Sequence, residues 1–306
     1  MAFQLKPDEP ASAGITRNVK SQIEKALKYL KANVAGQHGA LENETVGEIR
    51  KCFKRVRAAL RLVREELGDE CYHEENWCFR DAARPLTEVR DAHILVETAD
   101  RLRRHFPSDL EPAVFEKIRE PLVNHQGEVS RRVIERDKAL AAVKEVATRA
   151  LARLANWKLQ HEDWSVLETG MRHVYRTGRR AFLRAFENPS VENLHELRKQ
   201  AKYLWHALQL VEASLSAVEK DLVRATHELS TTLGEDHDLA VLRQTLAADP
   251  LRYGGQRALK GVIAAIDRYR QELEHQAISS ARRIYEDPPK VFVTRIAAAM
   301  HAEAVK

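Results

Sequence analysis

The stretch VGEIRKCFKRVRAALRLVREELG, at residues 46–68, decides the fold, because its apolar side chains recur every three or four residues. Ile49, Phe53, Val56 and Leu60 follow this spacing, which gathers them on one side of an α-helix. The same spacing continues through most of the chain, and the sequence lacks convincing alternation of the kind that marks a half-buried β-strand. The sequence therefore predicts an all-α fold.

The same stretch occurs a second time in the chain. Residues 46–68 align without gaps onto residues 194–216, with identities at basic positions, such as Lys54/Lys202, and at apolar ones. Chance similarity between two helices explains shared leucines, but it explains less well a shared run of charged residues. The repetition predicts two similar halves that pack around a pseudo-twofold axis.

A second pair of segments supports the repeat, since LTEVRDAHIL at 86–95 corresponds to LGEDHDLAVL at 233–242 at nearly the same separation. The two matches together allow a division of the chain into one continuous domain with two parts. We expect an N-terminal tail at 1–14, a first helical half at 15–160 and a second helical half at 161–306.

Glycine and proline residues divide the periodic segments into helices. Pro85 and Pro121 fall inside long periodic segments, where we expect each to kink or restart a helix. Long helices with short connections predict helical bundles. The expected helices lie near residues 15–35, 43–67, 70–104, 111–158, 163–187, 190–213, 216–247, 254–286 and 290–304.

The composition is that of a globular, helix-rich protein, because 31% of the residues are charged and 44% are hydrophobic. Lys and Arg number 50 against 45 Asp and Glu, so the net charge alone is a weak indication of anionic partners. The three cysteines form no disulfide framework, and we find neither a secretory signal nor about eighteen apolar residues in a row. We therefore expect a cytoplasmic protein that does not span a membrane.

The segment from Arg50 to Arg64 carries seven basic residues and no acidic one. At about 100° per residue, Arg50, Lys54, Arg57, Arg61 and Arg64 fall within roughly 80° of one another and form a cationic strip beside the apolar one. Each pair of like-charged neighbours destabilises an isolated helix by about 0.2–0.5 kcal/mol. A multivalent anion along the strip would reverse this cost through charge-assisted hydrogen bonds.

Further basic stripes occur in the second part of the chain. For any single stripe, the alternative interpretation is a solvated face neutralised by acids on neighbouring helices. Several stripes that the repeat would bring together are better explained by one shared polyanion. The added residues are Arg172, Arg176, Arg179, Arg180 and Arg184 in the segment 171–186, which has no acid, and Arg198, Lys199 and Lys202 in the segment that repeats 46–68.

Four segments of the chain, in their order and spacing, resemble the CHAD family of histidine-containing α-helical domains. These segments are VGEIRKCFKRVRAALRLV, LTEVRDAHIL, ENLHELRKQAKYLWHAL and LGEDHDLAVL. The resemblance covers nearly the whole chain and implies an all-α domain of two pseudo-symmetric four-helix-bundle halves packed together. It also implies binding of inorganic polyphosphate by basic helix faces that line a central groove or pore.

The resemblance assigns the polyphosphate contacts to particular residues. Arg90 and Asp91 match an Arg-Asp pair of the family, and we expect Asp91 and Asp238 to orient an arginine, because a carboxylate that faced phosphate would repel it. The residues carried over as contacts are Arg50, Lys54, Arg57, Arg61, His195, Arg198, Lys199 and Lys202. From the stripes we add Lys51, Arg172, Arg176, Arg179 and Arg180.

Three positions depart from the family pattern. Gly47 stands where a histidine matching His195 is usual, Trp205 stands where an arginine matching Arg57 is expected, and His206 takes a common tyrosine position. The strip of the second half therefore ends after two helical turns. We expect binding to be lopsided or weaker than in close relatives.

The sequence predicts a non-catalytic binding protein, with association with polyphosphate granules as a family-based expectation. Nucleic acid is the alternative partner, because it offers the same phosphates, and a phosphohydrolase is less favoured. His195 and Glu196 lack the companions of a catalytic site, and Cys71, His73 and Cys78 lack a fourth metal ligand. We expect no metal and no cofactor, and the sequence leaves the oligomeric state, partner proteins, preferred polymer length and physiological role of binding open.

Overall fold

The computed structural model describes residues 3–6, 8–32, 40–107 and 111–304, and every regular element among them is helical. This confirms the predicted all-α fold. The α-helices are α1 (Ala11–Ala32), α2 (Ala40–Leu62), α3 (Arg64–Leu67), α4 (Asp69–Ala83), α5 (Pro85–His105), α6 (Pro112–Ser130), α7 (Ala139–Arg153), α8 (Ser165–Glu187), α9 (Val191–Val211), α10 (Ala217–Ala248), α11 (Gln256–Ile284) and α12 (Pro289–Ala304). Short 3-10 or π segments are η2 (Arg131–Arg136), η3 (Leu154–Asn156), η4 (Glu212–Ser214) and η5 (Pro250–Tyr253).

Three of the expected helices are interrupted. Val63 separates α2 from α3, and Pro85 starts α5 directly after Arg84, because proline fits the first turn of a helix but not its interior. The segment expected as one helix over 111–158 breaks before α7, where Lys138 adopts a left-handed conformation with φ of 51°. Pro121 lies inside α6 and does not end it.

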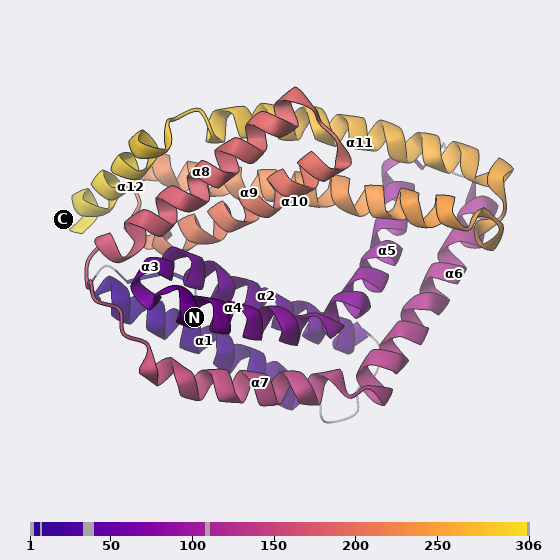
Figure 1. Cartoon of the computed structure of the whole chain (residues 1–306). Coiled ribbons are helices and arrows are strands. Elements are labelled where there is room, and N and C mark those ends of the chain that lie inside the picture. The colour runs from indigo at the N-terminus through magenta and orange to yellow at the C-terminus, as the bar shows by residue number, and fades with distance from the viewer. Residues whose placement is uncertain (1–2, 7, 33–39, 108–110, 305–306) are drawn as a thin grey trace.

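The helices surround the middle of the molecule rather than forming one parallel stack (Figure 1). Helices α1, α2, α4 and α7 lie together on one side, and α8 to α11 lie together on the other. Helices α5 and α6 connect the two groups at one end, where α5 packs against α10. Helix α2 contacts both α8 and α9, so the strip predicted on α2 lies where the two groups meet.

The apolar core has two parts. The larger cluster includes Ile49 and Phe53 of α2 together with Leu204 of α9, and the smaller one joins α5 and α6 to α10 and α11 through residues such as Leu102 and Leu239. Each cluster draws on both predicted halves, and the pseudo-twofold relation between the halves stays a prediction. No helix in the described ranges is both long and apolar enough to cross a membrane.

Gly170 allows α8 to approach α2 closely. A Cβ atom at this position would overlap the backbone of Leu62, at the carboxyl end of α2. A backbone atom cannot move aside as a flexible side chain can. The absence of a side chain at Gly170 therefore fixes how α8 sits beside the end of the basic strip.

Part of the expected N-terminal tail is packed against the helices. Phe3 and Leu5 are buried, and the backbone N–H of Leu5 donates a hydrogen bond to the carbonyl oxygen of Leu210 on α9 at 2.7 Å. The side-chain amide of Asn18 on α1 donates to the carbonyl oxygen of Gln4 at 2.9 Å. The N-terminal segment thus joins α1 to α9.

Candidate anion-binding site

The basic strip of α2 lies beside the buried apolar side of the helix. Arg50, Arg57 and Arg61 are half-buried, and Lys54 is exposed. Because the helix repeats every 3.6 residues, the same periodicity that buries Phe53 against the core aligns these four cations. Four of the five cations predicted for the strip therefore share one helix, whereas the fifth, Arg64, falls on α3 and pairs with Asp69 at 2.8 Å.

Neighbouring helices hold the guanidinium groups of the strip in place. Arg50 donates to the carbonyl oxygen of Ala83 at 3.1 Å and to the hydroxyl of Thr87. Arg57 donates through Nε to the side-chain oxygen of Asn76 at 3.0 Å. A guanidinium has five N–H donors, so these bonds orient each group while leaving other donors for a ligand.

Lys54 is the point where the strips of α2 and α9 meet. Its ammonium lies within electrostatic range of Arg50 on its own helix and of Arg198 and Lys202 on α9. Asp91 on α5 is the acid that acts on it. Among the residues that the structure describes, no carboxylate forms an ion pair with Lys54, so its charge stays largely uncompensated.

The pKa of Lys54 falls from its ordinary value to about 7. The main cause is desolvation, because protein surrounds the ammonium on several sides although the side chain is exposed. Repulsion by Arg50, Lys202 and Arg198 lowers the pKa further.

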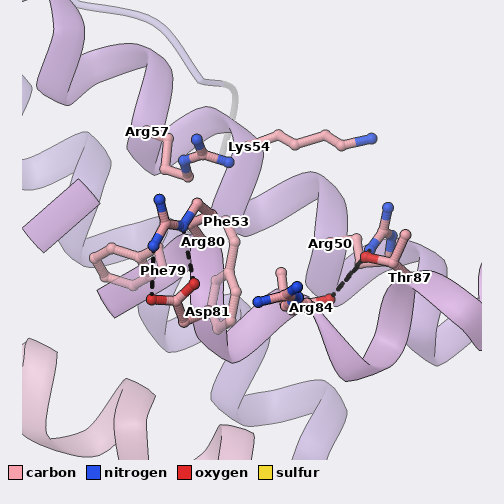
Figure 2. Close-up of a pocket in the computed structure, with 10 residues that line it drawn as sticks. Arg50, Phe53, Lys54, Arg57, Phe79, Arg80, Asp81, Arg84 and Thr87 are labelled. Atoms are coloured by element: carbon pink, nitrogen blue, oxygen red, sulfur yellow. Dashed lines mark hydrogen bonds and ion pairs between the residues drawn. The ribbon is translucent and has the colours of Figure 1, made fainter. Parts of the chain in front are cut away.

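A cavity of about 500 Å³ opens beside the strip, between α2 and the α4–α5 junction. Figure 2 shows Arg57 and the extended Lys54 on one side of it and the Arg80–Asp81 pair on the other. Buried phenylalanines contribute to its wall. Its cationic lining residues are Arg50, Lys54, Arg57, Arg80 and Arg84, and its acidic lining residue is Asp81.

Helix α9 contributes a second group of cations. Lys202 is half-buried, and burial is the main cause that lowers its pKa, followed by repulsion from Arg198. The Nε atom of Arg198 is buried, and no described residue forms a hydrogen bond with it. His195 places Nδ1 3.2 Å from Nδ1 of His237 on α10, so one of the two rings must donate to the other.

Two carboxylates lie at the edge of the cationic group. Desolvation raises the pKa of Asp91 although Arg50, Lys54 and Arg198 act in the opposite direction. Desolvation also raises the pKa of Asp238, whose carboxylate is 3.8 Å from Arg101. Both acids are within electrostatic range of Arg198, but no hydrogen bond joins either of them to it within the described ranges, so their expected orienting role stays a prediction.

The companion of Asp91 in the sequence, Arg90, has a different partner. Its guanidinium lies 3.3 Å from the carboxylate of Glu97 on the same helix. It also contributes to the potential around Arg50, whose pKa is lowered first by burial and then by this like charge. Arg90 therefore lies close to the other cations, and in the part of the chain that the structure describes its ion pair is with Glu97 and not with Asp91.

Three of the expected contact residues form ion pairs within their own helices. Lys51 lies 2.7 Å from Glu48, and Lys199 lies 2.6 Å from Glu196. Arg172 pairs with Glu168, one turn earlier on α8. These cations already have a local counter-charge, unlike Lys54.

The remaining arginines expected from α8 make other contacts. Arg176 and Arg180 are exposed on α8, and Arg176 contacts His173 at 3.4 Å. Arg176, Arg180 and Arg64 of α3 all lower the pKa of His173. Arg179 donates to the carbonyl oxygen of Tyr285 at 3.1 Å. The structure thus brings cations of α2, α5 and α9 close to Lys54 or to one another, and Arg176, Arg179 and Arg180 of α8 have the other partners given above.

Sequence reasoning missed several residues of the site. Arg80 and Arg84 line the cavity from α4 and its end, and Thr87 fixes Arg50. The four-residue spacing of Arg80 and Arg84 before Pro85 was an available signal. His237 was within a quoted motif, but only the fold places it beside His195.

The chemistry of the site favours binding of anions. Guanidinium groups recognise phosphate oxygens through paired hydrogen bonds, and lysine acts as a compact point charge. In the described ranges, no group of three or more His, Cys, Asp or Glu side chains is arranged to hold a metal ion. The fold and site define an all-helical protein in which cationic side chains from helices distant in sequence lie close together.

Comparison with known proteins places this architecture in a family. The family model for the CHAD domain matches residues 21–247, so the chain belongs to the CHAD domain family. No curated protein matches the sequence.

Two solved structures share the fold. The CHAD domain from the plant Ricinus communis is 19% identical, with a TM-score of 0.58, and the match covers 99% of this chain and 95% of that one. PptA from Streptomyces chartreusis is 13% identical, with a TM-score of 0.59, and the match covers 91% of this chain and 98% of that one. At these identities the similarity is one of fold.

Proposed function

We propose that this protein binds inorganic polyphosphate, without cleaving it, along the cationic surface formed by α2 and α9. The observation that carries the proposal is the position of Lys54, which faces Arg198 and Lys202 across the two helices and has no ion-pairing acid among the described residues. A linear polyanion can neutralise cations on both helices at once. Membership of the CHAD domain family supports this choice of ligand.

The arrangement suits a chain of phosphates better than a single small anion. The cations extend along α2 from Arg61 to Lys54, and Arg198 and Lys202 continue them on α9. The cavity beside α2 adds the guanidinium of Arg80. Successive phosphates along a polymer each carry negative charge and would replace the missing counter-charges one after another. Binding of this kind depends on the repeated charges along the polymer and not on the groups at its ends.

The proposed ligand is tested by titrating long-chain polyphosphate into the protein in a calorimeter at low and high salt. Because association releases counterions, raising the salt from about 50 to about 200 mM should lower the affinity more than about ten-fold. The double variant Arg50→Glu, Lys54→Glu should bind at least about ten-fold more weakly. Affinity that ignores both salt and this charge reversal would refute the proposal.

A matched control keeps the change in net charge constant. Arg257 and Lys260 are exposed at the start of α11, and their double replacement by glutamate alters the total charge as much as the site variant does. We expect this control to keep most of the affinity, because the total charge of the protein contributes little without local contacts. Equal losses in the two double variants would show that only net charge matters.

Two further measurements separate the alternatives. Competition between polyphosphate and duplex DNA at equal phosphate concentration tests nucleic acid as the partner, and stronger binding of DNA would reverse the assignment. Release of inorganic phosphate by the purified protein with added divalent metal ions would show that it is a hydrolase. In cells, the proposal extends to recruitment of the cytoplasmic protein to polyphosphate granules, which imaging of a fluorescent fusion would test.

A further inference from the structure

We propose that Lys54 is a site of direct acylation by acyl phosphates, and that this modification removes the central cation of the α2–α9 surface. An acyl phosphate joins a carboxylic acyl group to phosphate as a mixed anhydride. The phosphate part is recognised by the same cations as the proposed polymer, and the acyl carbon is the electrophile. The consequence for polyphosphate rests on the proposed function, but the reactivity of Lys54 does not.

The first requirement for such a reaction is an accessible amine that is partly unprotonated. The Lys54 side chain is exposed and extends away from the guanidinium groups of the cavity (Figure 2). Its pKa of about 7 leaves roughly half of the amine unprotonated at neutral pH. Desolvation and nearby cations are the two devices by which proteins activate lysine nucleophiles.

The second requirement is a means of holding the acyl phosphate beside the amine. Arg50 on the same helix and the pair Arg198 and Lys202 on α9 lie within electrostatic range of the Lys54 amine. The acid that acts on Lys54 is Asp91 of α5. Guanidinium groups bound to the phosphate would raise its local concentration and also stabilise phosphate as it leaves.

The reaction balances without an added oxidant or metal. The lone pair of Nζ attacks the acyl carbon, and a new carbon–nitrogen bond forms. The bond between that carbon and the phosphate oxygen breaks, inorganic phosphate leaves with the electron pair, and the nitrogen releases a proton to solvent. The product is a neutral amide, so the surface loses one positive charge.

Lys51 offers an internal control for the comparison. It lies on the same helix three residues away and is exposed, but it forms an ion pair with Glu48 at 2.7 Å. Cleavage after glutamate yields the peptide 49–65, whose lysines are Lys51 and Lys54. Fragment-ion mass spectrometry of this single peptide therefore measures both acylation rates under identical conditions.

The test treats the folded, full-length protein with acetyl phosphate at pH 7.4. Free amine increases about ten-fold for each unit by which a lysine pKa falls, and the accompanying loss of nucleophilicity cancels part of this gain. We expect Lys54 to be acetylated at least about ten times faster than Lys51. Equal rates at the two lysines, or a faster rate at Lys51, would overturn the inference.

A second arm separates anion guidance from simple nucleophilicity. A neutral N-hydroxysuccinimide ester of acetate should also favour Lys54, but by a smaller ratio than acetyl phosphate does, because it lacks the phosphate. Lys202→Gln should reduce the preference for acetyl phosphate. An identical Lys54 to Lys51 ratio with both reagents would disprove the guiding role of the cations.

Polyphosphate distinguishes failure of this inference from failure of the proposed function. If both hold, excess polyphosphate slows acetylation of Lys54 and leaves that of Lys51 nearly unchanged. Fast labelling of Lys54 that polyphosphate does not slow would support acylation and contradict polymer binding at this residue. Slow labelling of Lys54 in a protein that binds polyphosphate tightly would contradict acylation alone.

Discussion

The guanidinium of Arg61 on α2 lies 3.9 Å from the centroid of the Tyr203 ring on α9. This contact joins the basic strip of one predicted half to the helix that carries the basic residues of the other. The ring face holds the Arg61 guanidinium in place without neutralising it, so the positive charge remains available to an anion. The same contact ties the two helices together.

Replacing Tyr203 by leucine should lower both stability and anion binding. A cation–π contact of this kind contributes about 0.5–2 kcal/mol to stability. Without the ring, the Arg61 side chain would have more conformational freedom, and an anion that binds it would have to restrict that freedom. We expect a lower free energy of unfolding in urea titrations and a several-fold loss of polyphosphate affinity. Tyr203→Phe keeps the ring and should retain most of both, and a phenylalanine variant as weak as the leucine variant would contradict this explanation.

Replacing Gly170 by alanine should destabilise the fold. The added Cβ would overlap the backbone of Leu62, and overpacking of this kind costs about 1–3 kcal/mol. Gly261→Ala on α11 is the control, because nothing lies within 4 Å of a Cβ there and alanine favours a helix by about 0.5–1 kcal/mol over glycine. Thermal unfolding should show a lower melting temperature for Gly170→Ala than for the parent and an equal or higher one for Gly261→Ala. Similar melting temperatures in the two variants would count against the close contact.

Replacing Thr87 by valine should weaken anion binding with little effect on folding. The variant removes the hydroxyl that accepts from Arg50 and that donates to the carbonyl oxygen of Ala83. Arg50 would then be oriented by one partner, and we expect a loss of affinity of roughly three- to ten-fold. Thr148→Val on α7 is matched, since Thr148 bonds to the carbonyl oxygen one turn earlier in the same way, and it should keep the parent affinity.

Two double variants compare the cations around Lys54 with the arginines of α8. Arg198→Glu with Lys202→Glu alters the first group, whereas Arg176→Glu with Arg180→Glu alters the second. We expect the first to weaken polyphosphate binding more than about ten-fold and the second by less than about three-fold. Equal effects in a binding titration would extend the site onto α8, as the sequence alone suggested.

Acidification should destabilise the protein through His206. Its pKa is lowered to about 3, chiefly by burial and further by Lys202 and Arg55. Below about pH 6.5 the unfolded chain therefore binds a proton that the folded chain does not, and the free energy of unfolding falls by up to about 1.4 kcal/mol per pH unit. This loss should develop as the pH falls from about 6.5 towards 3.

The variant His206→Phe isolates this contribution. Urea titrations between pH 6.5 and 5 should show a smaller pH slope in the variant than in the parent. His275→Phe, on an exposed part of α11, controls for the loss of one histidine. An unchanged slope in His206→Phe would assign the acid sensitivity to other groups.

The fold class and the α2 strip could be predicted from the sequence because both follow from periodicity within one helix. Ile49 and Phe53 mark the buried side, and Arg50 and Lys54 mark the cationic one. The break at Lys138 could not be predicted in the same way, since a left-handed lysine leaves no clear signal in its neighbours. Interruptions of this kind depend on tertiary packing.

The site was harder to predict than the fold because most of it is assembled between helices. Helical spacing identified Lys54 and Lys202 separately, but it could not show that they face one another. The pair of Lys51 and Glu48 is different, because the two residues are three positions apart on one helix and spacing alone could have indicated it. Arg84 joins the cavity only because Pro85 ends one helix and starts the next. Contacts between distant segments carry no periodic signal.

The buried N-terminal segment connects two helices instead of extending freely from the domain. Phe3 and Leu5 are inserted between helices, and the hydrogen bond from Leu5 to Leu210 reaches the end of α9. Loss of these residues would remove a connection between α1 and α9. A short segment outside the helices would thereby influence the alignment of charges between α2 and α9.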